Sequence, residues 1–160
     1  MVWLDFETYF DKEFSLRKMT TAAYVRDPRF ETLCVGVKID GAEAVLMEHE
    51  EFKEWSASWQ WASTALGAHN SIFESLICAH HYNVYPGFWF DTQSMARALG
   101  LEETNLKFLM NYFGVGQKGD ELGNSKGRRR KDFNESEFAA LGVYCLGDTE
   151  GCAAIFEKMN

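Results

Sequence analysis

The sequence contains no hydrophobic run long enough to cross a membrane and no CxxC pair of cysteines. The first absence excludes a membrane-spanning segment. Met1 also leads into apolar residues without a basic leader, which predicts a cytoplasmic protein. The cysteines lie inside apolar patterns, which predicts buried thiols in a reducing compartment. They are Cys34, Cys78, Cys145 and Cys152.

Positive charge is also scarce, with 16 Lys and Arg against 24 Asp and Glu and a net charge of −8. This balance argues against a protein that grips nucleic acid with its whole surface. The exception is Lys126–Lys131, which holds five of the 16 cations. This run is either a solvated surface loop or a loop that contacts phosphates and draws a nucleic-acid strand toward the acidic body.

The chain of 160 residues is 46% hydrophobic and 15% aromatic, which predicts one folded domain over 1–160 with a sizeable core. Apolar patterns predict strands over 2–6, 31–40, 42–48, 65–69 and 88–90, the second and third joined at Asp40-Gly41. Helices are expected over 50–63, 71–82, 92–98 and 104–112, and from Asn134 to the C-terminus. The stretch 114–132 reads as a long loop, of the kind that is often functional or mobile.

A hairpin followed by alternating strands and helices predicts an α/β fold. We expect a mixed five-stranded sheet with helices on both faces. In such sheets, functional residues gather at the carboxyl ends of the strands.

The first strand ends in an acidic pair within "VWLDFET". Asp5 and Glu7 are two positions apart, so both side chains lie on the same face of an extended strand. Like charges held this close repel unless a cation neutralises them. The alternative is an acidic strand end that faces water.

The terminal helix carries a third acid on its apolar face. Asp148 completes a pattern with steps of three and four residues, and Tyr144 lies one turn earlier. An isolated carboxylate on such a face is costly, so Asp148 either joins a site or pairs with a structural Arg or Lys. The apolar members of the pattern are Phe138, Leu141, Cys145, Cys152 and Phe156.

The segment "HNSIFES" supplies the remaining candidates. Asn70 follows a predicted strand, where it is either an N-cap or a site residue. Glu74 lies in the first turn of the next helix, where a carboxylate also suits the helix dipole. Phe73 is expected in the core or in a cleft wall.

Together these segments resemble the DEDD family of 3′–5′ exonucleases, in the subtype whose third motif is Tyr-x-x-x-Asp. The three motifs are "DFET", "NSIFE" and "YCLGD", in that order. More narrowly, "LDFET", "AAYVRDPRFETLCVGVKIDG", "AHNSIFE" and "DTQSMARALGL" are similar to the exonuclease domain of phage-type family A DNA polymerases. Glu74 stands where most of the family has Asp, and we expect no polymerase domain within 1–160.

The resemblance implies a ribonuclease H-like (DnaQ-like) fold and a proofreading-type activity in a phage or bacterial host cytoplasm. The enzyme would remove nucleoside 5′-monophosphates from the 3′ end of single-stranded DNA or a frayed terminus. Two divalent ions, Mg²⁺ or Mn²⁺, are the implied cofactors. A polymerase domain or subunit is a possible partner.

The resemblance also implies a role for each residue. Asp5 would bridge the two ions, Glu7 and Asp148 would complete the ion that activates water, and Glu74 would serve the other ion. Tyr144 would orient the attacking water. The implied contacts to substrate are Thr8, Asn70 and Phe73 at the terminal nucleotide, and Arg128, Arg129 and Arg130 at phosphates.

Two rival interpretations stay open on the sequence alone. A catalytically silent member of the fold would bind single strands or a partner protein, although all four acids are retained. A 3′–5′ exoribonuclease would keep the chemistry and change the substrate, because no contact to a 2′-hydroxyl is visible in the sequence.

Overall fold

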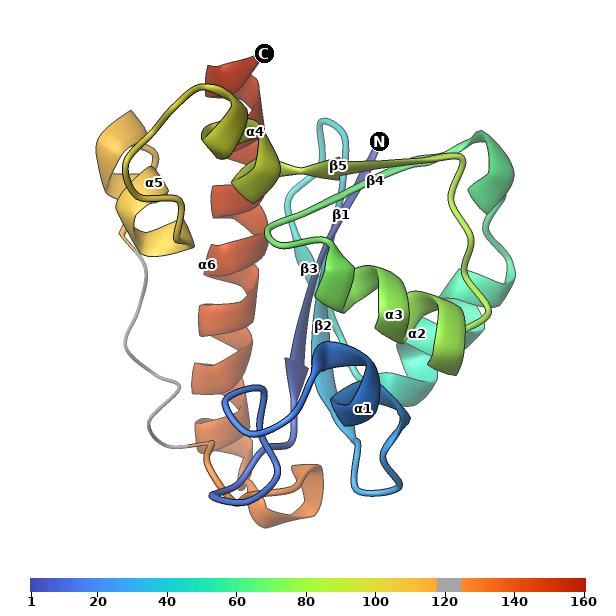
Figure 1. The fold of residues 1–160 in the computed structure, drawn as a ribbon. Helices are drawn as coiled ribbons and strands as arrows, with labels where there is room; N and C mark the ends of the chain where they lie inside the picture. The colour runs from blue at the N-terminus through green and yellow to red at the C-terminus, as the bar shows by residue number, and fades with distance from the viewer. Residues whose placement is uncertain (118–124) are drawn as a thin grey trace.

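The computed structural model describes residues 1–117 and 125–160 (Figure 1). Its strands are β1 (Val2–Thr8), β2 (Thr32–Ile39), β3 (Val45–Met47), β4 (Ala65–Ala68) and β5 (Phe88–Asp91). Its helices are α1 (Thr21–Arg26), α2 (His49–Ala57), α3 (Ile72–His81), α4 (Thr92–Ala98), α5 (Leu106–Phe113) and α6 (Glu135–Met159). Short 3₁₀ turns cover η1 (Trp61–Ser63) and η3 (Arg130–Asp132). Residues 118–124 of the predicted long loop lie outside the described part.

The predicted mixed five-stranded sheet is confirmed, in the order β3-β2-β1-β4-β5. The hairpin strands β2 and β3 and the pair β1 and β2 are antiparallel, whereas β1, β4 and β5 are parallel. The hairpin turn contains Gly41 at a φ of +74°, a conformation that glycine adopts without strain. β1 extends to Thr8, two residues beyond the prediction, and its register shifts between Glu7 and Thr8. The carboxyl end of this central strand is therefore locally irregular where the acids lie.

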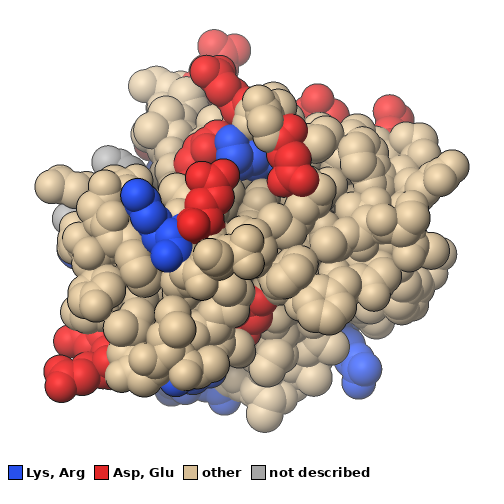
Figure 2. Space-filling model, turned by 90° about the horizontal axis from the view of Figure 1, so that it is seen from above, with Lys and Arg blue, Asp and Glu red and all other residues tan. Residues whose placement is uncertain are grey.

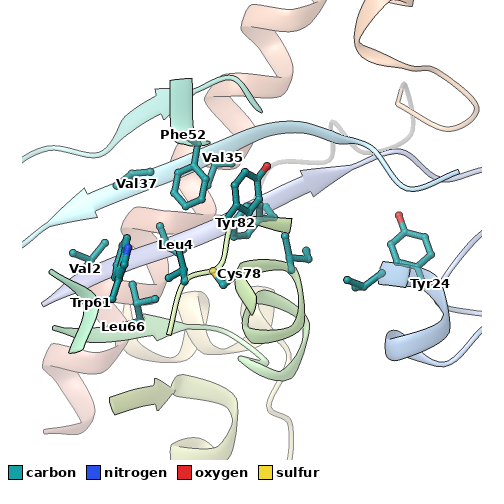
Figure 3. Close-up of a cluster of buried hydrophobic side chains, with 14 of the residues drawn as sticks. Val2, Leu4, Tyr24, Val35, Val37, Phe52, Trp61, Leu66, Cys78 and Tyr82 are labelled. Atoms are coloured by element: carbon teal, nitrogen blue, oxygen red, sulfur yellow. The ribbon is translucent and has the colours of Figure 1, made fainter. Parts of the chain in front are cut away.

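Helices cover both faces of the sheet, as predicted. Alternation along β1 sends Val2, Leu4 and Phe6 to the face covered by α1, α2 and α3, and sends Trp3 to the face covered by α4, α5 and α6 (Figure 1). Figure 3 shows the first of these cores, in which aliphatic side chains of the sheet meet aromatic rings and Cys78 of α3. Because β1 is central, burying its side chains on both faces holds it firmly between the two helical layers.

The C-terminal helix begins as the sequence predicts. The Asn134 side chain accepts a hydrogen bond from the Glu137 backbone, and Glu137 accepts one from the Asn134 backbone, at 2.9 and 3.0 Å. This capping box satisfies two of the amide groups that every helix leaves unpaired at its start. From there α6 runs across the sheet and packs on β1, β2, β3 and β4.

The helix predicted over 50–63 is too long. It ends at Ala57, because the indole of Trp61 donates to the Ser56 carbonyl at 2.8 Å and that of Trp59 donates to Thr64 at 2.8 Å. These side-chain bonds hold the chain in a turn before β4. The tryptophans of this region belong to the core, since Trp61 is buried and Trp55 and Trp59 pack against the same cluster.

The four predicted buried thiols are also confirmed, and all four cysteines are free. Across 1–117 and 125–160, none of the helices has both the length and the apolar character needed to cross a membrane.

Candidate active site

Three acidic side chains converge on the face of the sheet that α6 covers. Asp5 and Glu7 project from β1 and Asp148 from α6, and each offers a carboxylate oxygen within 4.8 Å of the others. Glu7 and Asp148 are only 8% and 3% exposed. The alternative of a water-facing strand end is therefore wrong for this pair of strand acids, because Glu7 is buried and α6 adds a third acid.

The close approach of α6 to the sheet depends on Gly36. Gly36 pairs with Asp5 across β1 and β2. A methyl group at Gly36 would lie 2.0 Å from Thr149 Oγ1 and 3.1 Å from the Cys145 carbonyl oxygen. The Cys145 thiol in turn donates to the Asp5 carbonyl at 3.5 Å. The missing side chain thus lets α6 place Asp148 beside the acids of β1.

Glu74 adds a fourth carboxyl group, from the first turn of α3. It is 4% exposed, and its Oε2 accepts no hydrogen bond from the described residues. Burial raises the pKa of Glu74 well above its ordinary value, and the charge of Asp5 raises it further. Glu74 does not belong to the set of carboxylates within 4.8 Å of one another, but the charge of Asp5 acts on it.

Tyr144 lies one turn before Asp148 on α6 and is 4% exposed. Burial raises the pKa of Tyr144 above its ordinary value, and the neighbouring charges of Asp148 and Glu7 raise it further. The phenol therefore remains protonated at any physiological pH and can serve as a hydrogen-bond donor. This state suits orientation of a water molecule better than proton abstraction.

These residues fit divalent metal ions. Carboxylate oxygens are the ligands that Mg²⁺ and Mn²⁺ prefer. Several buried carboxylates, one of them with an unsatisfied oxygen at Glu74, carry a cost that a bound cation removes.

The predicted contacts to the terminal nucleotide fall in different places. Thr8 and Phe73 line a cleft of about 780 Å³ together with Glu7 and Tyr144. Asn70 is not among the residues that line it. The other described residues that line the cleft are Phe6, Phe10, Asp11, Lys12, Ser15, Leu16, Arg17, Lys18, Tyr24 and Lys126.

The alternative reading of Asn70 as an N-cap is wrong. Ser71 occupies the cap position of α3, and Asn70 has a φ of +66°. Its backbone amide donates to Asp91 Oδ1 at 2.9 Å, and the same oxygen accepts from the Gln93 amide in the first turn of α4. Asp91 therefore ties the end of β4 to the start of α4, a role that sequence patterns did not indicate.

Tyr24 is a second residue that the sequence analysis missed. Its hydroxyl is 2.9 Å from Thr8 Oγ1 and donates to the Tyr9 carbonyl. Its ring stacks on Phe14 at 4.4 Å and lies 6.1 Å from Phe73. Burial raises its pKa to about 12, although the hydrogen bond to Thr8 opposes this. A tyrosine in "AAYVRDP" was the available signal, but only the tertiary contacts show that it supports the cleft.

The three arginines of the basic run have acidic and aromatic partners. Arg128 pairs with Glu137 at 2.5 Å, Arg129 with Glu31 at 2.5 Å and Arg130 with Glu48 at 2.8 Å. Their guanidinium groups stack over Phe133, Tyr9 and Phe138, 3.6–4.3 Å from the ring centroids. We call this set the arginine clamp. Binding of phosphate by its arginines stays a prediction, while Lys126 of the same run does line the cleft.

Figure 2 shows the molecule from above, where blue and red side chains adjoin one another among broad tan areas. Positive charge on this face is thus scattered among acids.

No protein-family model and no curated protein matches the chain, but solved structures of nucleases do. The catalytic core of RRP6 from Trypanosoma brucei aligns with a TM-score of 0.70 and 11% identity, over 99% of this chain and 40% of that one. Escherichia coli RNase D, an exoribonuclease involved in structured RNA processing, aligns with a TM-score of 0.63 and 16% identity, over 99% of this chain and 38% of that one. Brucella melitensis NrnC with bound Mg²⁺ aligns with a TM-score of 0.66 and 13% identity, over 99% of this chain and 70% of that one.

These similarities confirm the predicted ribonuclease H-like α/β fold. The chain spans well under half the length of the RRP6 core and of RNase D. The comparisons do not bear on the narrower resemblance to phage-type polymerases, which stays a prediction.

Proposed function

We propose that the protein is a metal-dependent 3′–5′ exonuclease that removes nucleoside 5′-monophosphates from single-stranded ends. The observation that carries the proposal is the convergence of Asp5, Glu7 and Asp148 within 4.8 Å in a nuclease fold. Glu74 and Tyr144 beside them complete the set of groups that the sequence motifs predict.

Asp5, Glu7 and Asp148, with Glu74 beside them, would hold two divalent ions. Such ions supply an activated hydroxide and neutralise the charge that develops on phosphate. Tyr144 donates a hydrogen bond that orients the attacking water. In the reaction, the water oxygen bonds to phosphorus and the bond from phosphorus to the 3′ oxygen breaks. The products are a 5′-monophosphate and a strand with a new 3′-hydroxyl.

The cleft supports attack at a strand end. Thr8 and Phe73 line it beside Glu7 and Tyr144, so a terminal nucleotide bound there would lie next to the acids. Phe73 offers an aromatic surface for a base. The sequence motifs favour single-stranded DNA or a frayed 3′ end as the substrate, with a proofreading role beside a polymerase domain or subunit.

A second candidate is a 3′–5′ exoribonuclease with the same site. The observation that favours it is the set of similar structures, which includes an exoribonuclease and two T. brucei proteins called RRP6 and RNase D. The two candidates differ at the 2′-hydroxyl of the substrate.

One experiment tests both. DNA and RNA of one sequence, labelled at the 5′ or the 3′ end, are incubated with the protein in Mg²⁺, Mn²⁺ or EDTA. We expect a ladder from the 5′ label, immediate release of a mononucleotide from the 3′ label, and no reaction in EDTA. The nucleic acid that is degraded faster, DNA or RNA, identifies the preferred substrate.

Asp5→Asn should abolish most of this activity, by about a hundredfold or more, because it removes a charged ligand without removing packing. Glu51→Gln, an exposed acid on α2, is the matched control and should behave as wild type. Wild-type protein that binds strands without cutting them would overturn the proposal and favour the binding module. Hydrolysis at an undiminished rate by Asp5→Asn would overturn the site.

A further inference from the structure

Besides Glu7 and Asp11, the cleft beside the acids is lined by four basic residues. Lys12, Arg17 and Lys18 come from the connection between β1 and α1, and Lys126 comes from the segment before α6. All four side chains are exposed. Four of the chain's 16 cations thus line one cleft, in a protein with a net charge of −8.

These cations are less neutralised than the arginine clamp. Among the described residues, Lys12, Arg17 and Lys126 have no carboxylate within ion-pair distance. Lys18 is 3.9 Å from Glu13, and both side chains are more than half exposed, so solvent screens that pair. Each arginine of the clamp, in contrast, lies within 2.8 Å of a carboxylate. The cations of the cleft are therefore more available to an anion than those of the arginine clamp.

The backbone that carries these cations is held in place. The buried Phe14 stacks on Tyr24, and Asp11 Oδ1 accepts hydrogen bonds from the amides of Glu13 and Phe14 at 2.8 and 2.7 Å. The Gly127 amide donates to the Phe10 carbonyl at 2.7 Å, which joins the two segments of the cleft. Fixed attachment points reduce the ordering cost of binding a polyanion.

We infer that Lys12, Arg17, Lys18 and Lys126 form a cationic wall that binds the phosphates of the nucleotides preceding the terminal one in a single strand. The inference rests on the proposed function for the identity of the strand. The acids bind the terminal phosphodiester through cations, whereas the wall attracts the rest of the strand directly. This division explains how an acidic protein holds a polyanion beside four carboxyl groups.

The test compares two variants with equal change in charge. In the first, the four cations of the wall are replaced by Gln. In the second, four exposed cations on helices away from the cleft are replaced by Gln. The matched control is Lys53→Gln, Arg97→Gln, Lys107→Gln and Lys158→Gln.

Binding of a fluorescein-labelled ten-residue oligothymidylate is measured by anisotropy in EDTA, from low to moderate salt. The wall variant should bind at least about tenfold more weakly at low salt. The slope of the logarithm of its binding constant against the logarithm of salt concentration should be shallower by about 2 to 3, because each phosphate contact to a single strand contributes about 0.7 to that slope. The control variant should keep the wild-type affinity and slope. An equal loss of affinity in both variants, or no loss in the wall variant, would overturn the inference that the wall binds the strand.

A second readout separates this inference from the proposed function. The ratio of kcat/KM for the ten-residue strand to that for a dinucleotide should fall about tenfold in the wall variant, because a dinucleotide has no preceding phosphates to bind. An unchanged ratio would overturn the wall while the nuclease activity stands. If wild type cuts neither substrate but the binding difference persists, the proposed function fails and the wall remains.

Discussion

Asp5 and Gly36 face each other across β1 and β2, and the missing side chain of Gly36 is what admits helix α6 to the acids. The helix backbone at Cys145 and the Thr149 hydroxyl occupy the space that a larger residue would need. A residue without chemistry of its own therefore determines the geometry of the acidic group.

Gly36→Ala should destabilise the protein by about 1–3 kcal/mol, because the added methyl group meets backbone as well as a side chain. It should also lower nuclease activity at temperatures where the variant is fully folded, since Asp148 moves with α6. Urea unfolding and initial rates measure the two effects. Gly147→Ala is the control: a methyl group there meets nothing within 4 Å, so stability should rise by about 0.5–1 kcal/mol without loss of activity.

Tyr144→Phe should lower kcat by about tenfold to a hundredfold with little change in KM, because the metal ligands stay and only the orientation of water is lost. The raised pKa of Tyr144 means that the phenol does not ionise in the working range. The shape of the pH profile of kcat should therefore be the same in the variant. Tyr112→Phe, at an exposed tyrosine, is the control. If wild-type kcat changes at high pH and this change is absent in Tyr144→Phe, the phenol acts by losing its proton.

Glu74→Gln should raise the metal concentration needed for half-maximal activity by about tenfold or more, and lower the saturated rate less. This follows if Glu74 serves the more weakly held ion. A metal titration of initial rates measures both quantities. An unchanged midpoint with a collapsed maximal rate would instead assign Glu74 an essential chemical role.

The same variant has a second signature in metal-free protein. The pKa of Glu74 is higher in the folded than in the unfolded chain, so the folded state loses stability as pH rises above the ordinary value of 4.5. Glu74→Gln removes this loss. In EDTA the variant should be more stable than wild type at pH 8, and the difference should close as pH falls toward 4.5. A difference that does not vary with pH would contradict the assigned cause.

Replacement of Arg128, Arg129 and Arg130 by Ser should lower the thermal stability of the protein more than its affinity for single strands. Each side chain joins a carboxylate and an aromatic ring, and Arg129 and Arg130 connect the start of α6 to Glu31 and Glu48. Thermal unfolding and strand binding on the same preparation measure the two effects. If affinity and its salt dependence fall while the melting temperature is kept, the run binds phosphate after all.

Asp27 provides a test of surface electrostatics outside the cleft. Hydrogen bonds from the Arg29 guanidinium and backbone lower the pKa of Asp27 from 3.8 to about 2. Because the folded pKa is the lower one, the stabilisation is present above about pH 4 and is lost as pH falls toward 2. The Asp27→Asn variant should therefore have a slightly lower melting temperature than wild type at pH 7. This difference in melting temperature should shrink as pH falls from about 4 toward 2. A constant difference would show that the effect is one of packing.

The acidic site was predictable because its geometry follows from local periodicity. Asp5 and Glu7 share a strand face, and Asp148 completes a helical stripe, so each could be placed before its partners were known. The support of the site was not predictable in this way. Asp91, Tyr24 and Gly36 act through neighbours distant in sequence, and no local pattern reports such contacts.

The basic residues show the same limit. The clustering of Lys and Arg in sequence predicts a phosphate-binding role for Lys126–Lys131, but it does not indicate whether acidic residues lie nearby in the folded protein. In the folded protein Glu31, Glu48 and Glu137 neutralise the arginines, whereas the dispersed Lys12 and Arg17 share a cleft.

The four buried cysteines are distributed so that each hydrophobic cluster contains a thiol. Cys78 lies in the cluster beneath α2 and α3, Cys152 in the one shared with α5, and Cys34 and Cys145 in the one where α6 meets β2. A thiol reagent can reach each one only when its own layer opens, since none is exposed in the folded state. The order in which the cysteines become modified in native buffer would therefore reveal whether α6, with Asp148, separates from the sheet before the opposite layer does.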